Sequence, residues 1–378
     1  MILITGGAGF IGSNFVLHLL NNEAVSEKIV VLDNLTYAGN MSNLSAISSN
    51  ANFNFEKCDI NNALALKEII RRYKPRAVIH FAAESHVDRS IKGPSKFIET
   101  NITGTFNLLE ASYEYFLTLD NGTNNTKKSG AQITKKQFRF LHVSTDEVYG
   151  SLEPNEPGFS ENHPYKPNSP YAASKASSDF LVRAWNKTYN LPTLISNCSN
   201  NFGPYQFPEK LIPLVILNAM DHHAIPIYGD GKQIRDWLYV EDHCRALFLI
   251  LDKGVIGETY NIGGNCEFQN IELVKKICLI LNDLLPLKDS AKITQYHELI
   301  QFIDDRPGHD KRYAVDNQKL KNAFSWKPRE TLFSGLKKTV QWYIDNLDWV
   351  KSIKNNSYKS WMKENYSKSF KKGENESS

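Results

Sequence analysis

The glycine-rich stretch TGGAGFIG at residues 5–12 constrains the fold of this chain more than any other feature. It follows the apolar run at residues 2–4, and apolar residues at helical spacing come after it. Gly6, Gly9 and Gly12 have the spacing G-x-x-G-x-x-G. Glycine is needed there because a side chain would obstruct both the tight turn and the approach of the backbone to a pyrophosphate, and the next helix would present free N–H groups. The stretch therefore predicts the first strand, loop and helix of a dinucleotide-binding fold.

Short β-rich runs alternate with amphipathic stretches over the first half of the chain. The expected strands are at residues 2–4, 29–33, 77–83, 138–144 and 192–197. Apolar residues at helical spacing predict helices at residues 13–22, 63–73, 105–116 and 171–185. Strands that alternate with helices indicate a parallel sheet covered by helices on both faces. We therefore predict an α/β fold with a Rossmann-type, doubly wound parallel sheet.

Composition and charge narrow the classes of function. The chain has 378 residues, of which 41% are hydrophobic and 22% are charged, as in ordinary globular proteins. A net charge of +3 argues against nucleic-acid binding, and no apolar run approaches the length of a membrane span. The five cysteines are odd in number and include no C-x-x-C pair, so they fit neither a disulfide framework nor a metal site. We expect free thiols, no secretory signal, no metal and a cytoplasmic protein.

Two polar stretches interrupt the alternation of strands and helices. Residues 118–137 are rich in Asn, Lys, Thr and Gly, and they fall between an expected helix and an expected strand. This composition predicts a surface insertion. Residues 355–378 are rich in Lys, Asn and Ser and predict a frayed polar tail.

Asp33 is the last residue of the second expected strand and follows the glycine-rich loop by about 20 residues. A carboxylate at this position can accept hydrogen bonds from both hydroxyls of an adenosine ribose, and it would repel a 2′-phosphate. The residue therefore predicts that the dinucleotide is NAD rather than NADP.

Tyr171 and Lys175 are four residues apart in the stretch YAASK, so they share one face of the expected helix. A neighbouring ammonium stabilises a phenolate, and we expect it to lower the pKa of the tyrosine from about 10 toward neutrality. Such a tyrosine can take the proton of a sugar hydroxyl while a hydride leaves the same carbon for nicotinamide.

The stretch VSTDEVYG places Thr145, Asp146 and Glu147 in a row at the end of an expected strand. Active sites in α/β folds lie at the carboxyl ends of the strands. Two carboxylates beside a hydroxyl at this place indicate a reaction that needs both a general acid and a general base.

Several longer stretches resemble a known family. They include TGGAGFIGSNF, HFAAESHVDRSI, ETNITGT, STDEVYG, PYAASKASSD, SNNFGPYQFPEKLIP, GDGKQIRDWLYVEDH and DRPGHDKRYA. Together they are similar to the extended short-chain dehydrogenase/reductase family and, within it, to the nucleotide-sugar 4,6-dehydratases, above all those that act on dTDP-glucose. The resemblance extends from Met1 to about Asn346, except for the insertion. The Asp-Glu pair, AESHVDRS and DRPGHD are its most specific parts.

The resemblance implies a division of labour among the candidate catalytic residues. Tyr171 would act on the C4 hydroxyl of the sugar, with Thr145 hydrogen-bonded to it and Lys175 beside it. Glu147 would take the C5 proton, and Asp146 would give a proton to the departing C6 oxygen. Asp146 must then be protonated at neutral pH. We expect burial and the neighbouring carboxylate to raise its pKa.

The resemblance also implies two sets of binding residues. Those expected to contact NAD, besides Tyr171 and Lys175, are Gly6, Gly9, Phe10, Ile11, Gly12, Asp33, Asn34, Thr36, Asp59, Ile60, Ala82, Ala83, Ser85, Thr100 and Asn201. Those expected to contact the nucleotide sugar are Ser85, His86, Asp88, Thr145, Asn200, Lys210, Leu211, Pro226, Ile227, Tyr228, Arg235, Asn270, Arg306 and His309.

The family pattern further implies two domains and a homodimer. Residues 1–197 would form the NAD-binding domain, to which a strand near residues 258–264 returns. Residues 198–350 would form most of a smaller C-terminal α/β domain that binds the nucleotide sugar. The helix with Tyr171 and Lys175 would be among those at the dimer interface.

Two other functions stay open at this point. A 4-epimerase, or a dehydratase for a UDP- or CDP-sugar, would share most of these motifs, and thymine differs from uracil by only one methyl group. A catalytically inactive NAD-binding protein would also keep the glycine-rich loop. It would have no need of Tyr171, Lys175 and the acid–base pair, all of which are present.

Overall fold

A computed structural model describes residues 1–21, 27–121, 133–288 and 292–354. A seven-stranded sheet forms the centre of the N-terminal part, with the strand order β10-β6-β5-β4-β1-β2-β3 and all neighbouring strands parallel. The strands are β1 (Ile2–Thr5), β2 (Ile29–Asp33), β3 (Phe53–Lys57), β4 (Ala77–His80), β5 (Arg139–Thr145), β6 (Thr193–Cys198) and β10 (Thr259–Ile262).

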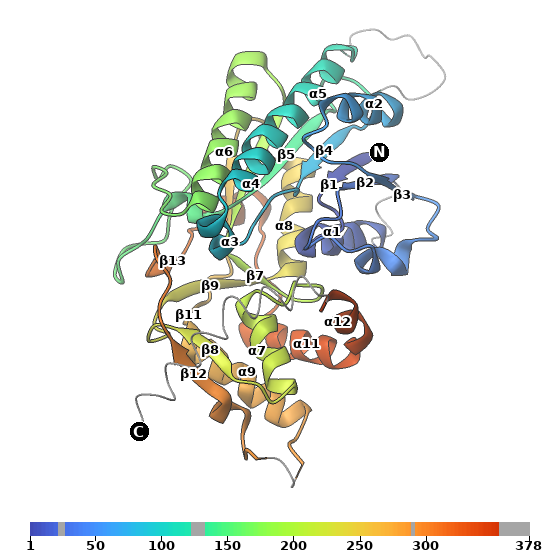
Figure 1. Cartoon of the computed structure of the whole chain (residues 1–378). Coiled ribbons are helices and arrows are strands. Elements are labelled where there is room, and N and C mark those ends of the chain that lie inside the picture. The colour runs from blue at the N-terminus through green and yellow to red at the C-terminus, as the bar shows by residue number, and fades with distance from the viewer. Residues whose placement is uncertain (22–26, 122–132, 289–291, 355–378) are drawn as a thin grey trace.

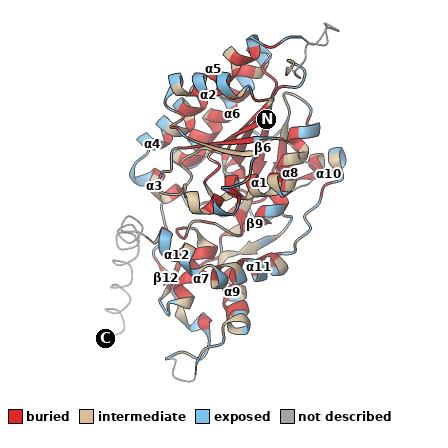
Figure 2. Ribbon diagram, turned by 90° about the vertical axis from the view of Figure 1, so that its right-hand side faces the viewer, coloured by how far each residue is buried: buried red, intermediate tan, exposed pale blue. Residues whose placement is uncertain are grey.

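Helices cover both faces of this sheet (Figure 1). Ile2 and Ile4 pack in one core cluster with α1 (Phe10–Leu20) and α8 (Val240–Lys253). Leu3, between them in β1, packs on the opposite face with α2 (Ala63–Tyr73), α5 (Thr105–Leu117) and α6 (Pro170–Tyr189). Burial on both faces explains why the central strands are almost entirely apolar. Figure 2 shows the same burial as a red centre with paler outer helix surfaces.

The predicted α/β fold is therefore confirmed, and each predicted strand and helix of the first half is present. β3 was not predicted: its sequence, FNFEK, forms an edge strand of which four residues are only half-buried. β4 ends at His80 rather than Ala83, so residues 81–83 leave the sheet as a loop. β10 pairs with β6 although it lies 61 residues later, from Cys198 to Thr259.

The order of the strands reverses between β1 and β4, where α/β folds bind ligands. The glycine-rich loop follows β1 and touches the loop that follows β4. Gly6 has a φ of +69°, and a Cβ there would lie 2.5 Å from the backbone nitrogen of Ala82. A Cβ on Gly12 would lie 2.2 Å from the carbonyl oxygen of Gly6. Glycine is thus required at position 6 for the two loops to meet, and at position 12 for the tight turn of the glycine-rich loop itself.

The C-terminal part has two small sheets. In one, β9 (Ile234–Tyr239) pairs with β7 (Asn200–Phe202), β11 (Glu267–Gln269) and β13 (Arg312–Tyr313). In the other, β8 (Ile225–Tyr228) pairs with β12 (Ile300–Ile303). The helices α7 (Leu211–Met220), α9 (Asn270–Leu284), α11 (Leu332–Asp345) and α12 (Leu347–Ile353) pack with these strands around a second core. Figure 1 shows this part below the seven-stranded sheet.

Short helices complete the described chain. They are η1 (Met41–Ile47), α3 (Val87–Lys92), α4 (Ser95–Phe97), the π-helix η2 (Ile98–Gly104), η3 (Asp146–Tyr149), η4 (Tyr296–Leu299) and α10 (Gln318–Phe324). Within the described ranges, no helix is both long and apolar enough to cross a membrane. All five cysteines are unpaired, and only Cys266 is not fully buried.

The two polar stretches are described only in part. Residues 122–132 of the predicted insertion and the whole tail at 355–378 lie outside the described residues. The two ends of the insertion meet at an isolated bridge between Asp120 and Thr134. Leu119 is buried and Ile133 packs against the same core, so the ends of the insertion are part of the folded domain.

Candidate active site

A cavity of about 460 Å³ opens at the carboxyl ends of the central strands. Its lining comes from the glycine-rich loop, from the loops after β2, β4 and β5, from the start of α6 and from residues 198–210. All five candidate catalytic residues and all the residues predicted to contact NAD line this one cavity. The structure thus gathers side chains from about 200 residues of sequence at the place where the strand order reverses.

Both carboxylate oxygens of Asp33 accept hydrogen bonds from the backbone. Its Oδ2 accepts a hydrogen bond from the N–H of Ala8 at 3.0 Å, and its Oδ1 accepts one from the N–H of Leu35 at 2.8 Å. Burial raises the pKa of the carboxyl, while these two bonds act to lower it. The carbonyl of Ala8 in turn accepts a bond from Asn43 at 2.8 Å. The carboxylate and the glycine-rich loop therefore form one rigid unit.

Asp146 is buried at the end of β5, where the chain turns into η3. Its side chain is 2% exposed, and its Oδ1 accepts a weak hydrogen bond from the Thr145 hydroxyl at 3.4 Å. Its Oδ2 has no hydrogen-bond partner among the described residues. Burial raises the pKa of Asp146 well above its ordinary value, and the negative charges of Glu147 and Asp236 raise it further. The expected direction is confirmed, and it favours a protonated acid.

Glu147 has different surroundings. Burial raises its pKa, but the positive charges of Arg306, Lys210 and Arg235 act in the opposite direction. The charges around the two adjacent carboxyl groups thus differ in balance: two carboxylates and Arg235 act on Asp146, whereas three cations and Asp310 act on Glu147, whose pKa is still raised by burial. This difference suits an acid and a base that work side by side.

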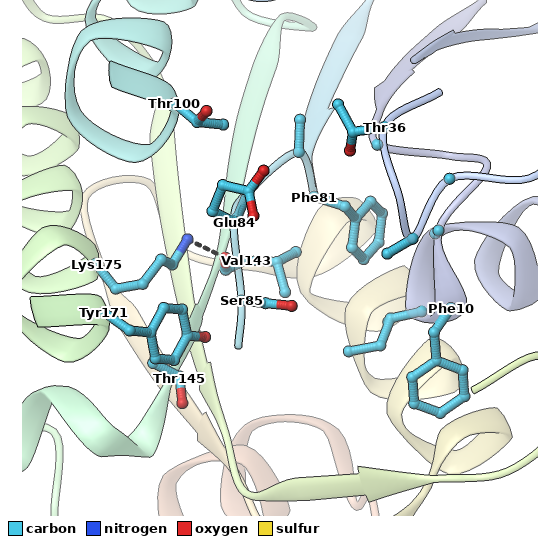
Figure 3. Close-up of a pocket in the computed structure, with 18 of the residues that line it drawn as sticks. Phe10, Thr36, Phe81, Glu84, Ser85, Thr100, Val143, Thr145, Tyr171 and Lys175 are labelled. Atoms are coloured by element: carbon cyan, nitrogen blue, oxygen red, sulfur yellow. Dashed lines mark hydrogen bonds between the residues drawn. The ribbon is translucent and has the colours of Figure 1, made fainter. Parts of the chain in front are cut away.

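Lys175 lines the same cavity as Tyr171, and its ammonium binds the backbone of β5. Its Nζ donates a hydrogen bond to the carbonyl oxygen of Val143 at 2.9 Å, as Figure 3 shows. Burial lowers its pKa to about 8. Burial and the charge of Glu147 raise the pKa of Tyr171 well above its ordinary value. The expected lowering was therefore wrong for the protein alone, because burial disfavours the charged phenolate and the nearby carboxylate of Glu147 disfavours it further.

The residues predicted to contact the nucleotide sugar divide into two groups. Ser85, Thr145, Asn200 and Lys210 line the cavity. The others lie outside its lining and are His86, Asp88, Leu211, Pro226, Ile227, Tyr228, Arg235, Asn270, Arg306 and His309.

Several residues of the second group contact one another next to the cavity. Asp88 lies 2.8 Å from Arg306 and accepts a hydrogen bond from the Tyr228 hydroxyl at 3.2 Å. The rings of Tyr228 and His309 are in edge contact. Ile227 packs its side chain in the C-terminal core, so only its backbone could face a ligand. These contacts join α3 to the C-terminal part of the chain.

The sequence analysis missed some residues that line the cavity. They are Phe81, Glu84, Lys96, Glu99, Gln206, Phe207 and Glu209, among others. Phe81 and Glu84 lie in the stretch HFAAESH, and the last three lie in QFPEK. Inspection of these two motifs residue by residue could have found the five residues that lie in them. Glu209 also pairs with Arg89 at 2.9 Å, which links the two parts of the chain.

Comparisons with known proteins agree with this geometry. The family model described as GDP-mannose 4,6 dehydratase matches residues 3–339. A dTDP-glucose 4,6-dehydratase of Shigella flexneri is 53% identical over 373 residues, covering 97% of this chain and 98% of that protein.

Two solved structures are similar over 93% of this chain and 99% of theirs. The dTDP-glucose 4,6-dehydratase of Bacillus anthracis in complex with NAD is 43% identical, with a TM-score of 0.78. The enzyme of the same name from Streptomyces venezuelae, with NAD and TYD bound, is 41% identical, with a TM-score of 0.81. With the cavity, the acid–base pair and the Tyr-x-x-x-Lys helix in place, these matches show that the chain belongs to the dTDP-glucose 4,6-dehydratase family.

Proposed function

We propose that this chain is an NAD-dependent dTDP-glucose 4,6-dehydratase, a hydro-lyase that forms dTDP-4-keto-6-deoxy-glucose and water. One observation carries the proposal: Asp146 and Glu147, in contrasting electrostatic surroundings, share one cavity with Tyr171 and Lys175. Oxidation at C4 needs only the last two residues. Removal of water across C5 and C6 needs a base and an acid in addition.

The cavity fits NAD. The close contacts around Gly6 and Gly12 leave the loop backbone free to approach a pyrophosphate. Asp33 is fixed by two backbone N–H groups and keeps lone pairs for the ribose hydroxyls. Bound NAD would accept the hydride from C4 and return it to C6. Because the cofactor is regenerated in each turnover, we expect it to stay bound.

The chain's own residues would move the protons. Tyr171 takes the proton of the C4 hydroxyl, and Thr145 orients that hydroxyl. The ketone at C4 acidifies the C5 hydrogen, which Glu147 removes. Asp146 then gives its proton to the C6 oxygen, which leaves as water, and Glu147 returns its proton to C5 when the hydride adds to C6. The raised pKa of Asp146 supports this order, because the acid must still carry a proton when elimination begins.

Positive charge at one end of the site suits a nucleoside diphosphate. Lys210 and Arg235 both lie close enough to Glu147 to affect its pKa, as does Arg306. Arg306 also has a buried Nε atom without a hydrogen-bond partner in the described part of the chain. A guanidinium can bind a phosphate with two parallel hydrogen bonds. We propose that these residues bind the diphosphate.

One experiment distinguishes the proposal from the nearest alternatives. Purified protein is incubated separately with dTDP-glucose and with UDP-glucose, and products are identified by mass spectrometry and NMR. We expect the 4-keto-6-deoxy product, formed faster from dTDP-glucose. A 4-epimer without loss of water would contradict the dehydratase function. Faster reaction of UDP-glucose would contradict the assigned nucleotide.

We further propose that the enzyme is a cytoplasmic homodimer that uses the outer face of α5 and α6. Phe106, Trp185 and Tyr189 form a continuous aromatic contact there, and Phe106 is 42% and Tyr189 41% exposed. The unpaired cysteines suit a reducing compartment.

Sedimentation analysis tests the dimer. The double substitution Phe106→Glu and Tyr189→Glu should yield monomers. Leu64→Glu, at a residue of α2 that is 76% exposed, is the matched control and should leave the dimer intact. A wild-type monomer would contradict this assembly, and cell fractionation tests the compartment.

A further inference from the structure

The ammonium group of Lys175 is almost completely buried. The residue is 4% exposed, and its Nζ has the Val143 carbonyl at 2.9 Å and Nε2 of His142 at 3.4 Å. Both are neutral acceptors at best. A buried ammonium without a negative charge nearby tends to lose its proton. The proposed chemistry needs a charged lysine, so the source of the balancing charge matters.

Asp179 lies one turn after Lys175 on the same face of α6 and is 2% exposed. Its Oδ2 accepts hydrogen bonds from the hydroxyls of Ser144 and Tyr165, both at 2.9 Å. Its Oδ1 lies 3.2 Å from Nε2 of His142. Two hydroxyl donors therefore hold this carboxyl in place, and the imidazole of His142 lies beside it. It is the buried acid nearest to Lys175 along the helix, and the proton transfers proposed above do not use it.

His142 lies between the two groups. Its Nε2 is 3.2 Å from Oδ1 of Asp179 and 3.4 Å from Nζ of Lys175. Its Nδ1 and Oδ1 of Asp179 are both buried without a hydrogen-bond partner in the described part of the chain. Burial and the charge of Lys175 lower the pKa of the imidazole, so His142 is neutral and does not supply the balancing charge.

The other titratable groups around this cluster do not supply the charge. His80 of β4 lies against His142 with ring centroids 5.2 Å apart, and burial lowers its pKa well below the ordinary value. Burial raises the pKa of Cys198 of β6 to about 12, so its thiol is neutral. Burial also raises the pKa of the phenols of Tyr165 and Tyr149. Asp179 is the acid that remains.

We propose that Asp179 is a positioning residue for catalysis: held by the hydroxyls of Ser144 and Tyr165, it is the counter-charge that keeps Lys175 an ammonium. The two groups act on each other, because Asp179 raises the pKa of Lys175 and Lys175 lowers that of Asp179. The inference rests on the proposed function, since it concerns the step in which Tyr171 takes the C4 proton. Asp179 itself is not among the residues that line the cavity.

The test is the pH dependence of the first hydride transfer. Protein with bound NAD is mixed rapidly with dTDP-glucose from pH 6 to pH 10, and the rise of reduced cofactor is followed at about 340 nm. For the wild type, the rate should fall as the pH rises through the pKa of Lys175, about 8. This fall is the alkaline limb of the pH profile. In Asp179→Asn the limb should move to lower pH by about one unit or more, as loss of a nearby opposite charge predicts. The rate should recover toward the wild-type value at low pH, with unchanged KM and NAD content.

Tyr165→Phe is the matched control, because it removes one donor but leaves the carboxylate. Its alkaline limb should move less than that of Asp179→Asn. If Asp179→Asn does not fold, the double variant Tyr165→Phe with Ser144→Ala replaces it. Loss of two donors raises the pKa of Asp179, now about 6, so the limb should move in the same direction.

An unmoved limb, or an equal loss of rate at every pH, would overturn the inference and leave Asp179 a structural residue. Failure of the proposed function would give a different result: wild-type protein would not reduce its NAD with dTDP-glucose at any pH.

Discussion

The ammonium nitrogen of Lys175 lies 2.9 Å from the carbonyl oxygen of Val143, although Tyr171 lies one turn earlier on the same helix. The tyrosine ring packs edge to face against Phe97, which fixes its place at the cavity wall. Burial and Glu147 raise its pKa in the protein alone. Tyr171 is therefore protonated at neutral pH in the protein alone.

Tyr171→Phe should remove the base for C4 oxidation. One general base contributes on the order of 10²–10⁴ in rate, and the first hydride transfer should slow by that factor. The measurement is reduced cofactor at about 340 nm after dTDP-glucose is added. Tyr115→Phe, a buried tyrosine on α5 that does not line the cavity, is the control and should react normally. Normal reduction in Tyr171→Phe would remove this residue from the mechanism.

Asp146→Asn should change how stability depends on pH. The folded protein raises the pKa of Asp146 well above 3.8, so the stability linked to this group is fully present below pH 3.8. It is lost as the pH rises toward and through the folded value. Asn does not titrate. The melting temperature of the wild type should therefore fall relative to that of the variant as the pH rises from 5 to 9. Asp348→Asn, at an exposed side chain, should show no such trend, and a constant difference for Asp146→Asn would contradict the raised pKa.

Asp33→Asn should weaken retention of the cofactor. Both carboxylate oxygens accept backbone N–H groups, so the amide NH₂ of Asn would oppose one of these donors. One lost bond of this kind costs about 1–3 kcal/mol, which corresponds to roughly 5- to 150-fold in affinity. Denatured wild-type protein should release NAD in near-stoichiometric amount, and the variant should release less. Recovery of NADP from the wild type would contradict the role of Asp33.

Arg306→Gln should raise the KM for dTDP-glucose and leave NAD content unchanged. Charge-assisted hydrogen bonds contribute about 1.5–3 kcal/mol, so we expect a rise of roughly 10- to 150-fold. Arg306 pairs with Asp88 from the other part of the chain, and the same change should lower the melting temperature slightly. Arg72→Gln breaks an exposed pair with Glu56 and serves as the control for loss of a charge. An unchanged KM would mean that Arg306 only joins the two parts.

The sequence predicted what local chemistry determines. The glycine-rich loop was predictable because Gly6 and Gly12 each allow an approach that no side chain permits. The raised pKa of Asp146 followed from its neighbour Glu147 and from its place at the end of a buried strand. In each case the cause lies within a few residues of the effect.

What the sequence did not predict depends on distant parts of the chain. The spacing of Tyr171 and Lys175 does not reveal that β5 offers a carbonyl to the ammonium. β3 escaped prediction because an edge strand needs only one buried face. The ion pair of Glu209 with Arg89 was not predicted either, because the two residues are 120 positions apart in the chain.

The central claim is that hydride leaves C4 and returns to C6 of the same sugar, with water lost in between. It is tested most directly with dTDP-glucose that carries deuterium at C4. NMR and mass spectrometry of the product should find the deuterium in the C6 methyl group of the 4-keto-6-deoxy sugar. Deuterium that stays at C4 in a sugar with its C6 hydroxyl intact, or that is lost to solvent, would contradict the mechanism.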